Sequence, residues 1–336
     1  MSDPSQCLII AEIGSVHDGS FGNAMKLIEA AAQCKVDAVK FQTHIAGAET
    51  LRNAPQPPYF RGEPRYEYFE RTAFSFEKWL ALKAHCEEQA VEFISSPFSI
   101  EAVHLLQKLG MKRWKVGSGE ITNIPMLEAI ARTGKPVLLS SGMSSWSELD
   151  AAVECILHHH RQLILLQCTS EYPCPSEKVG LNVMLEMRAR YQLPVGFSDH
   201  SLANYAAFAA ATLGASVVEK HFTFSRLMYG SDARHSLEPP EFADLVRGVR
   251  AIETCLANPV DKNANALQLQ FMKEIFEKSV VSVADINQGQ ILQEKDLTVK
   301  KPGTGIPARR LKEMIGKTAR QFIPKDSLIK EEDIDA

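Results

Sequence analysis

Short apolar runs alternate with amphipathic helical patterns along the first three-quarters of the chain. The helical patterns repeat apolar residues every three or four positions, whereas the runs are short continuous stretches of strand-forming residues. The runs occupy residues 7–14, 37–43, 91–98, 112–118, 136–143, 162–170, 194–200 and 216–222. The helical patterns lie near residues 22–34, 76–89, 99–109, 124–133, 145–159, 179–191, 203–213 and 239–256. This order predicts eight strands, each followed by a helix.

Helix start and stop signals support these boundaries. Ser75 and Ser99 precede helical patterns, and a serine hydroxyl at that position accepts a hydrogen bond from a free backbone N–H of the first turn. Gly110, Gly134 and Gly214 follow helical patterns, where a left-handed residue commonly ends a helix.

Eight strand–helix units over about 250 residues are typical of a (β/α)8 TIM barrel, an α/β fold. The alternative is an open, doubly wound sheet, which normally carries a glycine-rich phosphate turn after its first strand. The first turn reads EIGSVHDGS and lacks the G-x-G-x-x-G pattern, which favours the barrel. The long segment 44–74 would then be a loop on the active-site face, either a lid or a subunit contact.

The pattern changes after Asn258. Residues 259–278 are typical of a linker that contains a helix, and short β-like pieces with polar turns follow. We therefore predict a barrel domain at 1–258, a linker at 259–278 and a small domain at 279–336.

Composition excludes several classes of partner. The 336 residues carry a net charge of −4, so we expect neither nucleic acid nor an anionic membrane as a partner. No apolar run reaches the roughly 20 residues that a membrane-spanning helix needs. The start, MSDPSQCLII, lacks the features of a signal peptide, and the seven cysteines include no C-x-x-C pair, so a cytoplasmic protein is expected.

Two lysines stand out where the predicted strands end, which is the active-site end of a TIM barrel. Strand ends meet water, and this alone explains serines there. It does not explain Lys40 and Lys115, which lie between apolar residues in AVKFQ and RWKVG. A lysine directed into a barrel is desolvated unless an anion pairs with it. We therefore expect both lysines to bind an anion, with serine hydroxyls completing a phosphate or carboxylate site.

Two histidines end the last two runs, in GFSDH and VEKHF. His200 and His221 would lie at equivalent levels on neighbouring strands about 4.8 Å apart. Such a pair can bind one divalent cation at roughly 2.0–2.2 Å, although a core role for either ring is the alternative. The remaining coordination positions would suit a Lewis acid that polarises a carbonyl. Glu12 and Asp232 are the candidate carboxylates beside this ion or the substrate.

Ordered motifs over nearly the whole chain resemble the sialic acid synthase family, phosphoenolpyruvate-condensing enzymes that make nine-carbon nonulosonic acids. The motifs are IIAEIGSVHDGS, AVKFQTH, FISSPFS, WKVGSGEITNIPML, LLSSGM, CTSEYP, GFSDHS, EKHFT, SLEPPEF and VKKPGTGIPARRL. The tail resembles the antifreeze-like (β-clip, SAF) domain of these enzymes. The resemblance implies a barrel followed by that domain, in a domain-swapped homodimer whose small domain caps the partner's active site.

The resemblance also implies a reaction. An open-chain N-acylated mannose-type sugar presents its aldehyde to a divalent cation, usually Mn²⁺ with Mg²⁺ or Co²⁺ as alternatives, at His200 and His221. C3 of phosphoenolpyruvate attacks the aldehyde carbon, water adds at C2, and phosphate leaves with C–O cleavage. The activity implied is that of an N-acetylneuraminate synthase.

The family's functional residues fall on matching positions of this chain. The implied catalytic set is Glu12, Lys40, Lys115, His200 and His221. The implied phosphoenolpyruvate contacts are Lys40, Ser96, Lys115, Ser118, Ser140, Ser170 and Ser198. The implied sugar or water contacts are Glu12, Gln42, Glu120, Tyr172, Asp232 and Lys301. Which lysine faces phosphate and which faces carboxylate stays open.

Two positions depart from the family pattern. Ser170 stands where the family often has asparagine, and Lys301 stands where the sialic acid enzymes have an arginine that reaches the sugar's N-acyl group across the dimer. Lysine lacks the planar fork of arginine. A 2,4-diacetamido-2,4,6-trideoxyhexose, giving legionaminic or pseudaminic acid, is therefore the alternative substrate. Outside the family, the alternatives are a Schiff-base aldolase acting through Lys115 or Lys220, and a non-catalytic sugar-binding barrel.

Overall fold

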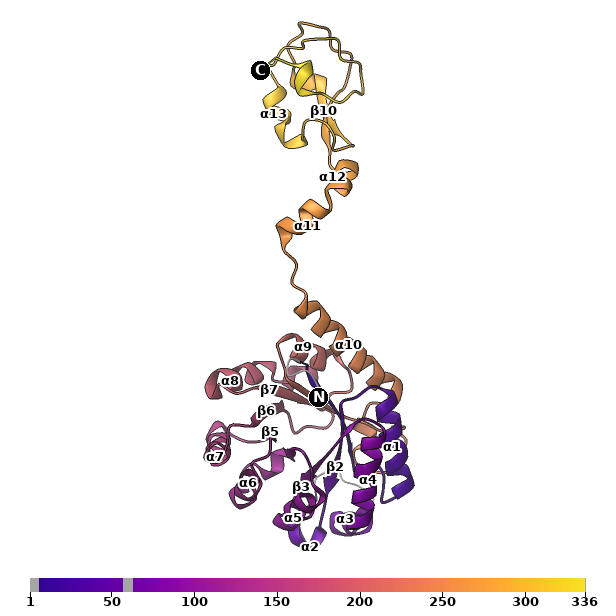
Figure 1. The fold of residues 1–336 in the computed structure, drawn as a ribbon, viewed down its shortest axis with the longest axis vertical. Coiled ribbons are helices and arrows are strands. Elements are labelled where there is room, and N and C mark those ends of the chain that lie inside the picture. Colours follow the sequence, from indigo (N-terminus) through magenta and orange to yellow (C-terminus); the bar gives the residue numbers. More distant parts are fainter. Residues whose placement is uncertain (1–5, 57–62, 336) are drawn as a thin grey trace. The chain divides into compact units, whose positions relative to one another are not determined.

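The computed structural model describes residues 6–56 and 63–335. The chain forms two compact units, Met1–Ala257 and Asn258–Ala336 (Figure 1). The first unit holds the predicted strand–helix repeats, and the second holds the small C-terminal domain.

Eight parallel strands form the first unit's sheet. They are β1 (Leu8–Gly14), β2 (Ala38–Thr43), β3 (Glu92–Pro97), β4 (Trp114–Val116), β5 (Val137–Ser140), β6 (Leu163–Cys168), β7 (Val195–Asp199) and β8 (Val217–His221). Strand β1 pairs with both β2 and β8, and the pairing continues through successive strands to β3 on one side and β4 on the other. Because β3 and β4 also lie against each other, the sheet is a nearly closed barrel, and the predicted TIM-barrel fold is confirmed.

Helices cover the outside of this barrel (Figure 1). They are α1 (Phe21–Gln33), α4 (Phe76–Glu88), α5 (Ile100–Leu109), α6 (Ile124–Ala131), α7 (Trp146–Leu157), α8 (Leu181–Tyr191), α9 (Tyr205–Thr212) and α10 (Pro239–Ala257). The predicted caps are confirmed. Ser75 and Ser99 accept hydrogen bonds from the N–H groups of Lys78 and Ala102, and Gly110, Gly134 and Gly214 all have positive φ.

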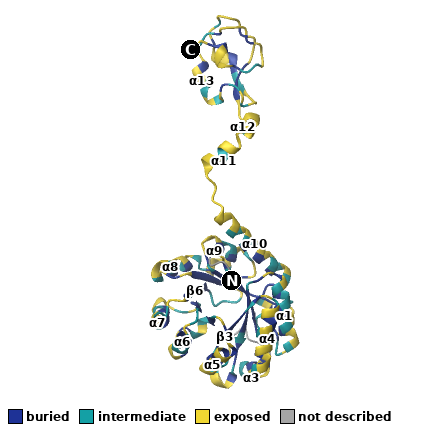
Figure 2. Cartoon of the chain, in the orientation of Figure 1, coloured by how far each residue is buried: buried dark blue, intermediate teal, exposed yellow. Residues whose placement is uncertain are grey.

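The strands alternate between two environments, and this alternation places the functional side chains. One face packs on the helices through the main hydrophobic core. The other face points into the barrel, where Ile10, Ala38, Ile94, Leu138, Leu166 and Val217 form a second, smaller apolar cluster. Two residues further along these strands, the inward positions hold Glu12, Lys40, Ser96, Ser140, Cys168 and Glu219. Most residues of the barrel strands are buried (Figure 2). The apolar cluster is therefore the floor beneath a polar site.

The segment between β2 and α4 differs from the predicted plain loop. It contains the short helices α2 (Ala46–Glu49) and α3 (Arg65–Thr72). Helix α3 buries Tyr68 and Phe69 in a small cluster with Ala46. Its mixed charged and aromatic sequence, RYEYFERT, has no long apolar repeat, which is why the pattern did not reveal it. Residues 57–62 of this segment lie outside the described residues.

The second unit begins with helices α11 (Lys262–Gln268) and α12 (Gln270–Phe276). Strands β9 (Ser279–Ser282) and β10 (Leu297–Lys300) then pair antiparallel, and the short helix α13 (Leu311–Met314) follows. The unit has its own core, built on Val280, Ile286, Leu292, Met314, Ile323 and Ile329. It therefore has the separate hydrophobic centre of a small domain.

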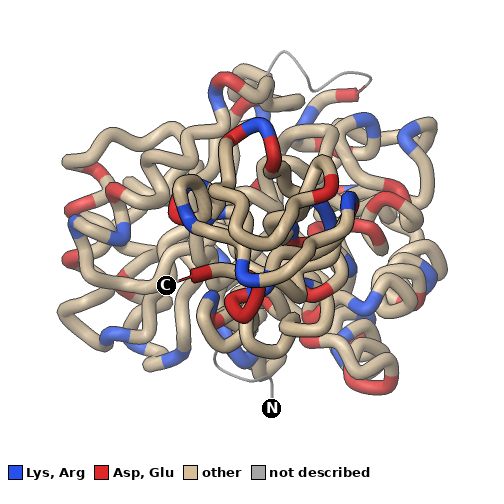
Figure 3. The backbone as a smooth tube through the Cα atoms, turned by 90° about the horizontal axis from the view of Figure 1, so that it is seen from above, with Lys and Arg blue, Asp and Glu red and all other residues tan. Residues whose placement is uncertain are grey.

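Lys and Arg residues are interspersed with Asp and Glu residues along the backbone of the chain (Figure 3). Within the described ranges, no helix combines the length and the apolarity needed to span a bilayer.

Candidate active site

A polar cavity opens at the C-terminal ends of the barrel strands. Twelve of the residues singled out in the sequence line it: Glu12, Lys40, Gln42, Ser96, Lys115, Ser118, Ser140, Tyr172, Ser198, His200, His221 and Asp232. They come from seven strands and from the loops that follow them. The barrel therefore gathers side chains from more than 200 residues of sequence into one site, at the end of the barrel where TIM-barrel enzymes hold theirs.

Lys40 and Lys115 share a buried carboxylate, Glu219. Glu219 Oε1 lies 3.2 Å from Lys115 Nζ and 3.9 Å from Lys40 Nζ, and it accepts a 3.0 Å hydrogen bond from the Ser198 hydroxyl. Lys40 Nζ also lies 2.8 Å from Glu12 Oε2. All four charged side chains are at most 5% exposed, so each charge is stabilised by its neighbours rather than by water.

The two lysines differ in their electrostatic surroundings. Burial acts to lower the pKa of Lys40, but Glu12 and Glu219 outweigh burial and raise it above its ordinary value. Burial lowers the pKa of Lys115, and its one close carboxylate, Glu219, offsets only part of that effect. Lys115 is therefore the lysine whose charge most needs an incoming anion.

Glu12, Gln42 and Asp232 converge beside Gly14. Gln42 Nε2 donates a 2.7 Å hydrogen bond to Glu12 Oε1. Gly14 has φ +54°, and a methyl group on it would come within 3.0 Å of Asp232 Oδ2 and 3.4 Å of Gln42 Nε2. Glycine at this position therefore permits both the left-handed turn and the close approach of the polar groups.

His200 and His221 lie side by side at the mouth. Asp199 pairs with Lys220 in the register of β7 and β8, which puts the two following residues, His200 and His221, at the same level. Their ring centroids are 5.7 Å apart. The predicted juxtaposition of the two imidazoles is therefore present.

The two rings can act as metal ligands. His200 Nδ1 lies 2.7 Å from the Thr169 carbonyl and must donate to it, which leaves a lone pair on Nε2 near the Tyr172 hydroxyl at 3.2 Å. Burial, and secondly His221, lower the pKa of His200 to about 3, so its ring is neutral. His221 Nδ1 is buried without a hydrogen-bond partner among the described residues. Three-residue groups of His, Cys, Asp or Glu with metal-binding geometry do not occur in the described part of the chain, so an ion here would take two protein nitrogens.

Three residues named from the sequence do not line this cavity. Ser170 is one contact away from it, with its hydroxyl 3.1 Å from that of the lining residue Ser118. Glu120 accepts a 2.8 Å hydrogen bond from Asn123, and burial raises its pKa. Lys301 belongs to the second unit, where its ammonium lies 4.8 Å from the centre of the Phe276 ring.

Lys220, a candidate for Schiff-base chemistry, points away from the cavity. Its Nζ donates to Asp199 Oδ2 and to the Ser201 carbonyl, both at 2.6 Å, and to the Ala203 carbonyl at 2.9 Å. An ammonium held by three acceptors has no lone pair for attack on a carbonyl. This geometry disfavours a Schiff base on Lys220.

Sequence reasoning missed part of the cavity wall. Glu219, His44, Arg65, Phe69 and Phe98 all line it. Period-two alternation, counted from His221, would have directed Glu219 inward and Lys220 outward. Arg65 and Phe69 lie on α3, whose position no sequence pattern indicated.

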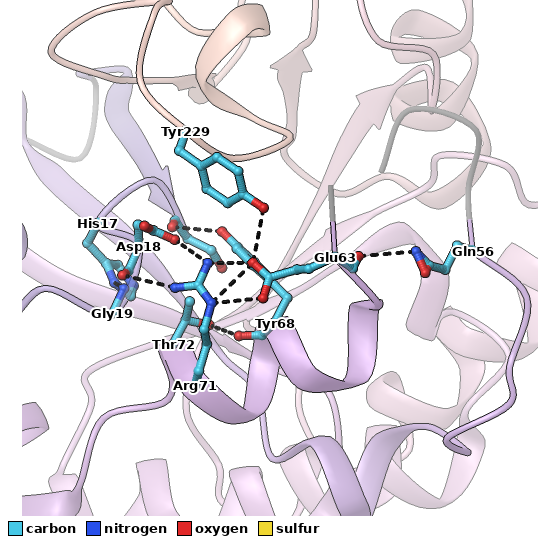
Figure 4. A network of polar contacts seen from close by, with 10 residues as sticks. His17, Asp18, Gly19, Gln56, Glu63, Tyr68, Arg71, Thr72 and Tyr229 are labelled. Carbon is cyan, nitrogen blue, oxygen red and sulfur yellow. Dashed lines mark hydrogen bonds and ion pairs between the residues drawn. The ribbon is translucent and has the colours of Figure 1, made fainter. Parts of the chain in front are cut away.

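Arg71 links three loops around the mouth (Figure 4). Its guanidinium donates to Glu63, with contacts of 2.9 and 3.1 Å from Nε, and to Asp18 Oδ1 at 2.7 Å. The Tyr229 hydroxyl donates to the same Glu63 carboxylate at 3.1 Å. The network therefore connects the loop after β1, the segment around α3 and the loop after β8.

Comparison with known proteins adds independent information. A model described as the NeuB family matches residues 27–261, and a SAF domain model matches residues 277–335. The N,N'-diacetyllegionaminic acid synthase of Campylobacter jejuni is 37% identical over 332 residues, covering 96% of this chain and 99% of that protein. The human N-acetylneuraminate-9-phosphate synthase is 35% identical, covering 98% and 93%.

A solved structure agrees with these sequence matches. The N-acetylneuraminic acid synthetase of Leptospira borgpetersenii superposes with a TM-score of 0.72 at 29% identity, covering 80% of this chain and 92% of that one. The fold and these matches place the protein in the class of synthases of sialic-acid-type sugars. The chain belongs to the NeuB family and carries a C-terminal SAF domain, as the sequence motifs predicted.

Proposed function

We propose that this protein condenses phosphoenolpyruvate with the aldehyde of an open-chain N-acylated mannose-type sugar, giving a nine-carbon 2-keto acid and phosphate. The observation that carries the proposal is the buried group of Lys40, Lys115 and Glu219 next to the His200–His221 pair. The two lysines suit a small, multiply charged anion, and the imidazoles suit an ion that activates a carbonyl.

The chain's own residues would position phosphoenolpyruvate. Lys40 and Lys115 would pair with its phosphate and carboxylate oxygens, and Ser96, Ser140 and Ser198 would donate hydroxyl hydrogen bonds. Their placement on the barrel strands holds the substrate in one orientation, so that C3 faces the sugar. Burial of both lysines excludes water that would otherwise compete for the anion.

The sugar would lie on the side of Glu12, Gln42 and Asp232. Their carboxylate and amide groups would bind its hydroxyls and the water that adds at C2 of phosphoenolpyruvate, with Asp232 accepting the proton that this water loses. His200 and His221 would hold a divalent cation, with Mn²⁺ the expected ion. When bound, such a cation supplies Lewis-acid polarisation of the aldehyde carbonyl.

A diacetamido sugar is the second candidate substrate. The C. jejuni relative, at 37% identity, is named for legionaminic acid, and Lys301 departs from the arginine of the sialic acid enzymes. An N-acetylmannosamine-type substrate remains the first candidate. We further propose that the active form is a homodimer, in which Lys301 of the small domain reaches the sugar bound by a partner subunit.

Phosphate release tests the reaction directly. The purified protein, phosphoenolpyruvate and Mn²⁺ are combined with a panel of N-acylated hexoses, including diacetamido-trideoxy sugars, and the product is identified by mass spectrometry. We expect stoichiometric phosphate and a nine-carbon keto acid with one sugar class. Absence of phosphate release with every sugar would contradict the proposal.

The metal site has its own test. We expect His200→Ala and His221→Ala each to abolish Mn²⁺-dependent phosphate release while the barrel stays folded by circular dichroism. Chelation of the wild-type protein should have the same effect and be reversed by added Mn²⁺. Full activity in either variant would show that these rings do not hold the ion.

A further inference from the structure

A chain of buried polar contacts runs from helix α2 to the cavity through His44. The Glu49 carboxylate lies 2.9 and 3.0 Å from His44 Nδ1, and His44 Nε2 lies 3.1 Å from Gln42 Oε1. Gln42 Nε2 then donates to Glu12 Oε1 at 2.7 Å. The His44 and Glu49 side chains are 5% and 4% exposed, so water does not share these contacts.

The available hydrogens determine which atom donates and which accepts in each of these contacts. A carboxylate only accepts, so His44 Nδ1 must donate to Glu49, and the Gln42 amide nitrogen must face Glu12. The Gln42 carbonyl oxygen then faces His44, and His44 Nε2 must donate as well. In this arrangement both ring nitrogens carry hydrogen, so His44 is an imidazolium.

The alternative arrangement rotates the Gln42 amide by half a turn. A neutral His44 would then accept from the amide N–H, and the amide oxygen would face Glu12, which would need a proton. Lys40 Nζ at 2.8 Å from Glu12 Oε2 opposes that protonation, because it stabilises the ionised carboxylate. The contacts favour the proton on His44.

The surroundings of His44 suit a cation. Its ring stacks between Phe69 and Phe98, with centroids 3.6 and 4.3 Å away, and aromatic faces attract positive charge. Arg65, which lines the same cavity wall, acts against the charge. Burial, and secondly His44, lower the pKa of His17 to about 4, so that neighbouring ring is neutral. Glu49, in direct contact, is the group that neutralises the charge of His44.

We propose that His44 is a positioning residue: an imidazolium held by Glu49, it fixes the Gln42 amide with its N–H groups toward Glu12 and the cavity. The sugar therefore meets a hydrogen-bond donor at Gln42, so its atom there must be an acceptor, a hydroxyl or carbonyl oxygen. The identity of this ligand rests on the proposed function, whereas the state of His44 does not.

Imidazole nitrogen NMR tests the state of His44 without any substrate. The His44 signal is the one missing from the spectrum of His44→Gln. At neutral pH we expect both ring nitrogens of wild-type His44 to be protonated, and we expect Glu49→Gln to leave one of them without hydrogen. A singly protonated His44 in the wild-type protein would overturn the proposal.

Steady-state kinetics test its consequence. His44→Gln should raise KM for the sugar about tenfold or more, as loss of a supporting residue does, and change KM for phosphoenolpyruvate less than about twofold. The matched control is His85→Gln on α4, where a histidine lies beside Glu29 and Glu88 away from the cavity, and it should leave both constants unchanged.

The outcomes separate this proposal from the proposed function. An unchanged sugar KM in His44→Gln would overturn the positioning role even if the reaction occurs. Absence of phosphate release in the wild-type protein would remove the reaction, and the NMR signal would still decide the protonation of His44. If His44→Gln does not fold, Glu49→Gln takes its place in the kinetic comparison, and the His44 signal is assigned by residue-specific labelling.

Discussion

Glu219 determines what an anionic substrate meets inside the barrel. Together with Glu12 it balances the charges of Lys40 and Lys115 before any substrate arrives. The proposed substrate phosphoenolpyruvate would therefore not enter a pocket of uncompensated positive charge. It would have to draw the lysines from carboxylates that already pair with them, so part of its binding free energy would offset the broken ion pairs.

Replacement of Glu219 by glutamine tests this balance. Glu219→Gln leaves two buried ammonium groups with one carboxylate, and breaking a buried ion pair costs about 3–5 kcal/mol of stability. We expect a lower Tm for the free protein and a larger rise in Tm on adding phosphoenolpyruvate than in the wild type. Glu92→Gln is the control, because it breaks the Arg113–Glu92 ion pair, whose residues do not line the cavity. An equal phosphoenolpyruvate-induced shift in Glu219→Gln and in the wild type would contradict the role of Glu219.

The difference in folding stability between the wild type and Glu219→Gln should depend on pH. Lys115 and Lys40 outweigh burial and lower the pKa of Glu219 from 4.5 to about 2. A carboxylate with a lowered folded-state pKa stabilises the fold fully above its unfolded value and loses that contribution as pH falls to the folded value. The stability advantage of the wild type over Glu219→Gln should therefore shrink between pH 4.5 and about 2.

Site residues could be predicted from the sequence where a polar side chain occupies an inward position of an apolar strand. Lys40, Lys115, His200 and His221 could be found because charged or metal-binding side chains interrupt apolar strands, and they do meet in the cavity. Glu219 was missed because it lies in a run of three polar residues with Lys220 and His221, and the histidine alone drew attention as a metal ligand. Strand alternation counted from His221 does direct Glu219 inward, and the register of β8 with β1 agrees with it.

At the scale of elements, the loops around the opening of the cavity are joined by contacts in which the barrel strands take no part. The Arg71 network joins the loop after β1 to the α3 segment and the loop after β8. Arg71 is 41% exposed, so its ion pairs with Glu63 and Asp18 add little to global stability. Their effect is local: they hold α3, and with it Arg65 and Phe69, against the cavity.

Removal of Arg71 should therefore loosen the mouth without unfolding the barrel. We expect Arg71→Ala to change the free energy of unfolding by less than about 1 kcal/mol and to speed hydrogen exchange in residues 63–72. The sugar KM should rise as well. Arg52→Ala is the matched control, since the contacts of Arg52 with described residues, to Glu67, Glu70 and Tyr66, all lie within the same segment. Similar exchange in both variants would mean that the network does not order the segment.

The elements themselves were largely predictable from sequence. All eight strands form within the predicted runs, because β-branched and aliphatic residues bounded by turn residues leave few other arrangements. Helices α2 and α3 were not predictable. Their residues are held by a few tertiary contacts, such as the Tyr68 hydroxyl donating to the Ser15 carbonyl at 3.1 Å, and such contacts leave no periodic pattern.

At the scale of the whole molecule, the two units have separate hydrophobic cores. The barrel gathers the candidate catalytic groups, and the second unit presents Lys301 from the turn after β10. Sequence motifs identified both domains, since the family and SAF matches cover 27–261 and 277–335. A contact between subunits could not be derived from the pattern of one chain, because complementary surfaces leave no periodic signal.

Lys301 provides a test of the proposed dimer. If the small domain reaches the sugar bound by a partner, Lys301→Ala should raise KM for the sugar more than KM for phosphoenolpyruvate. Lys300→Ala is the control, because Lys300 forms an ion pair with Asp326 inside its own unit. Sedimentation of the wild type should show a dimer. Equal effects of Lys301→Ala on both constants, or a monomer with full activity, would argue against the inter-subunit contact.

The missing side chain at Gly14 has a consequence for how this site can diversify. Three polar atoms from β1, β2 and the loop after β8 surround a gap that one methyl group would fill. If the cavity binds a sugar as proposed, variation in sugar preference has little room at the first turn of the barrel. It has more at α3, whose residues Arg65 and Phe69 line the cavity from outside the barrel strands.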